Sequence, residues 1–73
     1  MRKIYLAQAK EAHEQGANRR VFRKIMEAAV AARAFEQAHT IGIKYESKID
    51  DDLIIGLAIA QVADRRTRRP IGK

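Results

Sequence analysis

Hydrophobic positions recur with helical spacing in the first half of the chain. Between residues 3 and 15, five side chains fall on one side of a helical projection: Tyr5, Leu6, Ala9, Ala12 and His13. A longer hydrophobic stripe from Val21 to Phe35 predicts a second helix over residues 19–39. Between the two, Gly16 suits the end of one helix, and Asn18 suits the cap of the next. The pattern therefore predicts two successive helices.

The hydrophobic period changes after Gly42, which we expect to end the second helix. Hydrophobic and polar residues alternate over residues 41–46, and this two-residue period predicts a short strand. A lone strand needs a partner: residues 2–6 in an extended form, another copy of the chain, or a binding partner. An exposed strand edge offers unpaired backbone groups to a partner, so Ile43 and Tyr45 become candidate partner-binding residues.

The last hydrophobic run predicts a third helix, over residues 52–66. Asp50, Asp51 and Asp52 supply a cap and first-turn negative charge, and two arginines end the helix, as its dipole favours. From Leu53 to Ala63, only one glycine and one glutamine interrupt the hydrophobic residues. A helix that is hydrophobic all round is normally buried all round. We therefore expect this run to be either the central core helix or one face of an oligomer.

These elements predict a mainly α fold, a small three-helix domain with a possible short strand. The chain of 73 residues allows one domain, which we assign to residues 1–66, followed by a flexible basic tail at residues 67–73. Of the 34 hydrophobic residues 13 are alanine, so 21 larger side chains must form a thin core. The chain has no cysteine, so disulfides cannot reinforce that core.

Positive charge gathers in two clusters. The net charge is +6, and five positive charges lie in residues 65–73. Arginine clusters bind phosphates with little sequence information, and they bind acidic protein surfaces equally well. We therefore predict contact with an acidic protein surface, with possible non-specific contact to nucleic acid. The candidate partner-binding residues of the two clusters are Arg19, Arg20, Arg23, Lys24, Arg65, Arg66, Arg68 and Arg69.

Residue types that carry catalysis or bind metals are scarce. The chain holds one serine, two threonines, two histidines and no cysteine, which argues against an enzyme. His13 and His39 lack further ligands at useful spacing, so we expect no metal site and no cofactor. No run reaches the roughly 18 hydrophobic residues of a membrane span. We therefore expect a cytoplasmic protein without a membrane partner.

Residues 12–26 resemble the helix-turn-helix of bacterial and phage repressors. Four positions carry the resemblance: Ala12, Gly16, Phe22 and Ile25. It implies a reading helix that begins at Asn18 and presents the first basic cluster to DNA. Glu11 and Gln15 depart from the motif, because they occupy places that the family fills with hydrophobic residues.

In size and in its alanine- and arginine-rich composition, the whole chain resembles small phage-encoded regulators that bind host RNA polymerase. This resemblance implies a non-enzymatic regulator that inhibits transcription by docking on the polymerase in the host cytoplasm. The alternative function is a sequence-specific DNA-binding repressor that uses the helix-turn-helix, and a third is a structural or RNA-associated basic protein. The sequence leaves the partner, the sign of regulation and the oligomeric state open.

Overall fold

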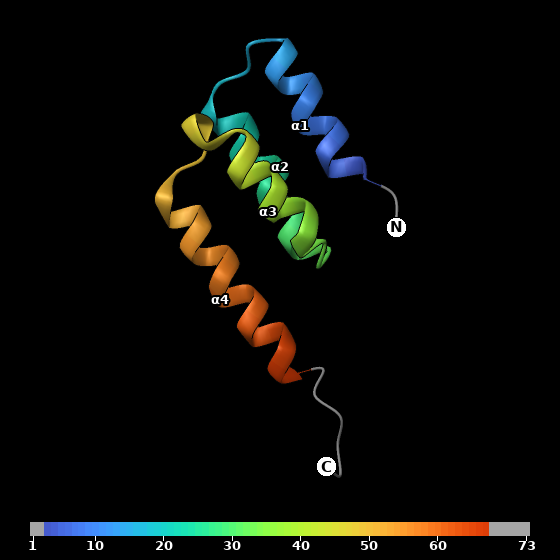
Figure 1. The fold of residues 1–73 in the computed structure, drawn as a ribbon, viewed down its shortest axis with the longest axis vertical. Coiled ribbons are helices and arrows are strands. Elements are labelled where there is room, and N and C mark those ends of the chain that lie inside the picture. The colour runs from blue at the N-terminus through green and yellow to red at the C-terminus, as the bar shows by residue number, and fades with distance from the viewer. Residues whose placement is uncertain (1–2, 68–73) are drawn as a thin grey trace.

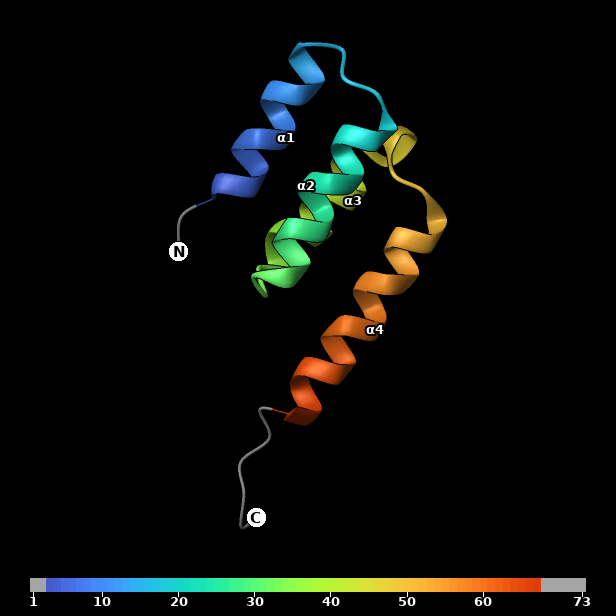
Figure 2. The same ribbon diagram turned by 180° about the vertical axis from the view of Figure 1, so that it is seen from behind.

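Four α-helices and one short 3-10 helix form the fold of residues 3–67, the part of the chain that the computed structural model describes (Figure 1). In chain order they are α1 (Ile4–Glu14), α2 (Arg19–Ala31), α3 (Phe35–Lys44), the 3-10 helix η1 (Glu46–Lys48) and α4 (Asp51–Thr67). α4 lies beside α2 and α3 and extends past their ends (Figures 1 and 2). The mainly helical fold class is confirmed, with four helices instead of three.

Local signals set the boundary between α1 and α2. Gly16 has a φ of 70°, a left-handed conformation in which glycine carries no steric penalty, and it follows the last turn of α1. Asn18 caps α2, because its side-chain oxygen accepts a hydrogen bond from the Val21 N–H at 3.3 Å. Both roles agree with the sequence prediction.

A residue from another helix caps the start of α1. Lys3, at the N-cap position, makes no side-chain cap hydrogen bond. Instead, Gln37 of α3 places its Oε1 atom where it accepts hydrogen bonds from the Tyr5 N–H at 3.0 Å and the Leu6 N–H at 3.3 Å. Gln37 is buried, and these bonds satisfy backbone donors that a free helix would leave to water. The contact ties α1 to α3.

The single helix predicted over residues 19–39 is wrong, because a turn divides it into α2 and α3. Arg33 adopts a φ of 60°, and the Ala34 N–H donates to the Ala29 carbonyl at 2.8 Å. No glycine or proline marks this turn in the sequence. The turn lets α3 fold back on α2 and bury Ala38 and Ile41, so tertiary burial outweighs the local helical pattern.

The predicted strand at residues 41–46 is also wrong: residues 41–44 belong to α3, and no strand occurs within residues 3–67. A strand would place Ile41, Ile43 and Tyr45 on one face. The helix instead buries Ile41 and Tyr45, four residues apart, and leaves Ile43 75% exposed. Gly42 lies inside α3, where it does not end a helix.

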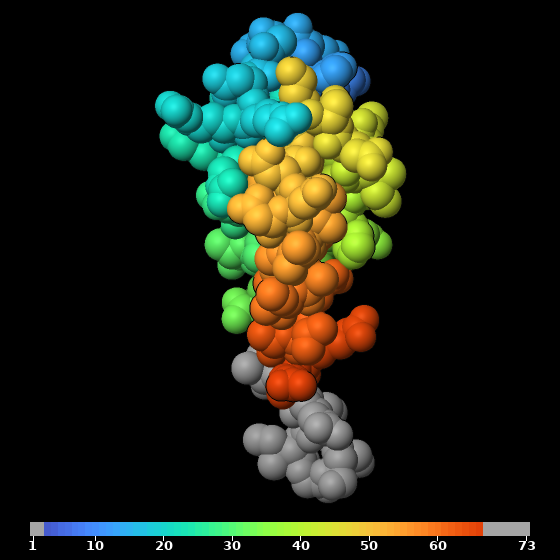
Figure 3. Space-filling view, turned by 90° about the vertical axis from the view of Figure 1, so that its left-hand side faces the viewer, coloured from blue at the N-terminus to red at the C-terminus, as the bar shows by residue number. Residues whose placement is uncertain are grey.

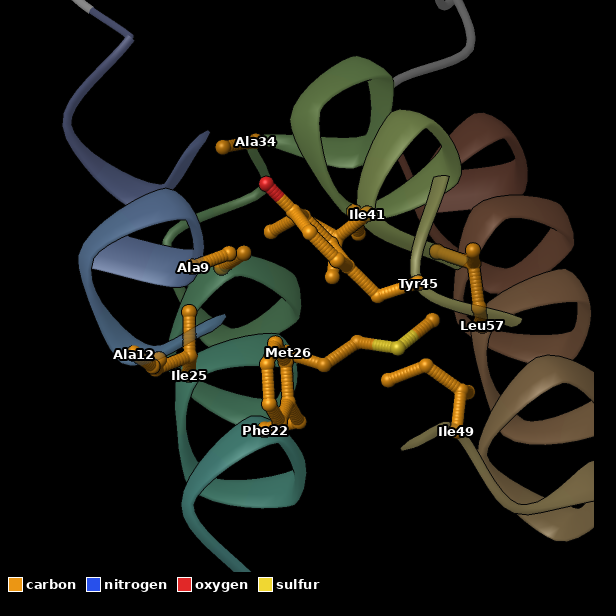
Figure 4. Packing of buried hydrophobic residues seen from close by; sticks show 12 residues of the cluster. Ala9, Ala12, Phe22, Ile25, Met26, Ala34, Ile41, Tyr45, Ile49 and Leu57 are labelled. Carbon is orange, nitrogen blue, oxygen red and sulfur yellow. The ribbon is translucent and has the colours of Figure 1, made fainter. Parts of the chain in front are cut away.

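Most of the hydrophobic core comes from α1, α2 and α3 (Figure 4). The largest fully buried side chains are Phe22 and Met26 of α2 and Ile41 of α3. The Tyr45 ring lies 5.3 Å from the Phe22 ring, centroid to centroid, in a tilted arrangement that aromatic pairs favour. Alanine fills many of the remaining core positions, which allows the short helices to approach one another closely.

Of the two alternatives expected for the run from Leu53 to Ala63, the central core helix is wrong. Within it only Leu57 is buried, at 3% exposure, and Leu53 packs partly against the core. Ile55 and Ile59 are 60% and 64% exposed. The reason is that α4 covers the other helices with one face only, so its opposite face points outward.

Two glycine substitutions test the helix assignments with opposite expected signs. Gly56 lies inside α4, and a methyl group added there meets nothing within 4 Å. Gly56→Ala is therefore expected to raise the free energy of unfolding by about 0.5–1 kcal/mol, through the better helix propensity of alanine. Gly16→Ala should lower it by about 1 kcal/mol, because alanine is strained at a φ of 70°. Urea unfolding checks both, and equal signs would contradict the assignments.

Candidate interaction surface

Carboxylates at the start of α4 and in the residue before it pair with part of the first basic cluster. The Arg19 Nη1 atom lies 3.0 Å from the Asp50 Oδ1 atom. Arg23 reaches three acidic residues, with nitrogen–oxygen distances of 3.2 Å to Asp52, 3.3 Å to Glu27 and 3.6 Å to Asp50. The pairs with Asp50 and Asp52 join the first two turns of α2 to the start of α4.

Arg23 is the most strongly engaged cation of this network. The hydrogen bond that it donates to Asp52, together with the charge of that residue, raises the pKa of the Arg23 guanidinium above its ordinary value. The shift strengthens the preference for the charged form, which an arginine already holds throughout the physiological range. Because these groups are largely exposed, water and salt screen the ion pairs, and each pair contributes little to the stability of the fold.

The other two members of the cluster remain available to a partner. Arg20 and Lys24 are exposed, and neither forms a hydrogen bond or ion pair with any residue that the structure describes. The four predicted basic residues therefore divide into two that hold α4 and two with free charges on α2.

The second basic cluster lies at the opposite end of α4. Arg65 and Arg66 are exposed in its last turn, as predicted from the helix dipole. Asp52, which pairs with Arg23 of the first cluster, precedes Arg65 by 13 residues along α4. At the rise of an α-helix this spacing corresponds to about 20 Å between the two clusters. Arg68 and Arg69, with most of the predicted tail at residues 67–73, lie outside the described residues; Thr67 is the last residue of α4.

A further ion pair ties this end of α4 to the turn after α2. The Arg33 Nε atom donates to the Asp64 Oδ1 atom at 2.6 Å. Together with the pair between Arg19 and Asp50, this contact shows that α2 and α4 run side by side in the same direction. Nearby, His39 and Gln61 link α3 to α4 through a 3.1 Å side-chain contact.

The structure separates the two candidate residues of the expected strand. Ile43 projects from α3 into solvent. Tyr45 is only 6% exposed and packs between Phe22 and His13, whose ring centroids lie 5.3 Å and 5.2 Å from its own. Tyr45 is therefore a core residue and not a contact residue for a partner.

Three of the four positions that carry the helix-turn-helix resemblance are buried: Ala12, Phe22 and Ile25. Glu11 and Gln15 are exposed and take no part in the packing between α1 and α2. The expected reading helix also has the acidic start of α4 against its first turn.

Within residues 3–67, no cluster of three His, Cys, Asp or Glu side chains could hold a metal ion.

A groove of about 370 Å³ lies between α2 and α4. Its charged lining consists of Arg23, Glu27 and Asp52, and Arg23 pairs with both carboxylates. No helix of the described region is long and hydrophobic enough to cross a membrane.

Sequence reasoning missed the role of α4 in this surface. We expected the acidic triplet at residues 50–52 to cap the helix, and its pairing with arginines about 30 residues away has no local signal.

Comparison with known proteins identifies no relatives: no protein-family model, curated protein or solved structure matches the chain.

Proposed function

We propose that this protein is a non-enzymatic regulator that docks on an acidic protein surface and inhibits transcription, with host RNA polymerase as its partner. Arg20 and Lys24 of α2 make the first contact. The arginines that end α4 add long-range attraction, because opposite net charges speed the encounter of two proteins.

One observation carries the choice of a protein partner over a DNA site. The carboxylates of Asp50 and Asp52 lie against Arg19 and Arg23, within the same face that a reading helix would insert into the major groove. There they would face the phosphates of the duplex, and like charges repel. A protein partner avoids this repulsion when its acidic groups face Arg20 and Lys24 and lie away from Asp50 and Asp52.

The choice of RNA polymerase follows from the resemblance in size and composition to phage-encoded regulators of that enzyme. A small, largely neutral body with two basic clusters is suited to docking on a larger assembly, and its near neutrality argues against wrapping nucleic acid. Inhibition then follows if the bound protein occupies a surface that promoter DNA or another factor needs.

A double charge reversal tests this function. Arg20→Glu with Lys24→Glu should weaken binding to purified bacterial RNA polymerase at least about tenfold, because both free cations of α2 are reversed. Lys3→Glu with Lys10→Glu is the matched control, since both lysines are exposed on or beside α1 and the net charge changes equally. We expect that control to bind within about threefold of the parent. Surface plasmon resonance measures the affinities, and transcription from a purified template measures the inhibition.

Equal losses in the two double variants would show that net charge alone drives binding, and would contradict the docking face on α2. Selection from random DNA duplexes tests the rival function. Recovery of one enriched, palindromic sequence would overturn the proposal in favour of a repressor.

A further inference from the structure

The outward face of α4 carries a continuous hydrophobic stripe, which we call the outer stripe. Its residues repeat at intervals of three and four and therefore share one side of the helix: Ile55, Ala58, Ile59 and Val62. The three large side chains are 60%, 64% and 50% exposed, and Ala58 is exposed as well. Figure 3 views this side of the molecule, and α4 runs along it with no other element in front.

The stripe lies opposite the face by which α4 joins the fold. Leu53 and Leu57 point to the core, and Asp64 is held by Arg33. The outer stripe is therefore not needed for the contact of α4 with its own chain. Isoleucine and valine exposed in such a row are typical of an interface.

Charged residues bracket the stripe symmetrically. Asp51 and Asp52 precede Ile55 by four and three residues, and Arg65 and Arg66 follow Val62 by three and four. Asp51 and Arg66 are exposed, and neither has an ion-pair partner within residues 3–67. The acidic residues therefore lie as far from one end of the outer stripe as the basic residues lie from its other end.

We propose that a second copy of this chain covers the outer stripe, with the two α4 helices packed antiparallel across a two-fold axis near Ala58 and Ile59. In this arrangement the acidic end of each helix meets the basic end of the other, so both ends attract. A parallel pair would place acid against acid and base against base. The charge pattern therefore favours a second copy of this chain as the partner of the outer stripe, and it favours the antiparallel over the parallel arrangement of the two α4 helices.

This dimer does not depend on the proposed function. It uses one face of α4, whereas the first docking contacts, Arg20 and Lys24, belong to α2. Arg66 takes part in both proposals, so the variant that separates them is Ile59→Lys, which leaves Arg66 in place. A chain that does not bind polymerase could still form the dimer. A chain that does not dimerise could still dock on polymerase as a monomer, so the two proposals can fail separately.

Sedimentation of the intact chain tests the dimer. Between about 1 µM and about 1 mM, the mass should rise from 8.3 kDa toward twice that value. Ile59→Lys places a charge in the middle of the stripe and should weaken association at least about tenfold. Ile43→Lys is the matched control, because Ile43 is 75% exposed but lies on α3, and it should associate like the parent. Circular dichroism verifies that each variant keeps its helix content.

Exchange of the charges tests the direction of the helices. Asp51→Arg alone and Arg66→Asp alone should each weaken association by about threefold or more, because each creates like-charge contacts. The double variant should recover to within about twofold of the parent, since the exchanged ends attract again. Both substitutions oppose the helix dipole, so helix stability cannot explain the recovery.

A parent chain that stays at 8.3 kDa throughout this concentration range would overturn the proposal. So would equal effects of Ile59→Lys and Ile43→Lys, because the stripe would then have no special part in association. A double charge variant weaker than either single variant would contradict the antiparallel arrangement.

Discussion

Phe22→Ala is expected to lower the free energy of unfolding by about 3–5 kcal/mol, which is a large share of the stability of so small a domain. The Phe22 side chain is fully buried on α2 and packs against the Tyr45 ring. Its removal leaves a cavity in a core where five of the other eleven members are alanine, which is too small to refill it. We therefore expect much of the variant to be unfolded near 25 °C.

Val21→Ala is the control for this substitution. Val21 neighbours Phe22 on the same helix but is 39% exposed, so its truncation should change the stability by no more than about 0.5 kcal/mol. Urea unfolding followed by circular dichroism measures both variants. A Phe22→Ala protein as stable as the Val21→Ala protein would contradict the placement of Phe22 in the core.

Leu57→Ala is expected to cost about 2–4 kcal/mol, whereas Ile55→Ala should change stability by no more than about 0.5 kcal/mol. The two residues lie on the same helix and have the same hydrophobic character. They differ in burial, because Leu57 is 3% exposed and Ile55 is 60% exposed. The comparison therefore tests which face of α4 meets the rest of the fold.

The unfolding measurements for this pair belong at about 1 µM, so that self-association does not add to the stability of either variant. Equal losses would mean that α4 is buried on both faces, as its hydrophobic composition alone suggests. A larger loss for Ile55→Ala would reverse the orientation of the helix.

Elements with strong local signals could be predicted from the sequence. The first helix ends at the left-handed Gly16, the second begins at the Asn18 cap, and α4 begins at the acidic triplet of residues 50–52. The signals are a backbone preference at Gly16, a hydrogen bond between close neighbours at Asn18 and first-turn negative charge in α4. Such preferences do not depend on the rest of the fold.

The division between α2 and α3 has no such local signal. The turn at Arg33 lies in an alanine-rich segment that favours helix on both sides, and only the burial of Ala38 and Ile41 against α2 explains it. The alternation of residues 41–46 was equally ambiguous, since a short hydrophobic run fits either a strand or a buried helix. Tertiary packing decided both cases.

The interaction surface was predictable in its composition but not in its contacts. The charge pattern identified Arg19, Arg20, Arg23 and Lys24 as one cluster. It did not indicate that Asp50 and Asp52, at the start of α4, would pair with two of them, because these residues lie about 30 positions apart. The hydrophobic run of α4 had two interpretations, a core helix or an oligomer face, and the exposure of Ile55 and Ile59 contradicts the first.

The proposed function is tested most directly by one titration at physiological salt. The fluorescently labelled full chain is titrated with purified RNA polymerase in the presence of excess random duplex DNA, and fluorescence anisotropy reports the bound fraction. Docking through Arg20 and Lys24 predicts saturable binding that the DNA does not reduce. Absence of binding, or transfer of the chain to the DNA, would contradict the proposal.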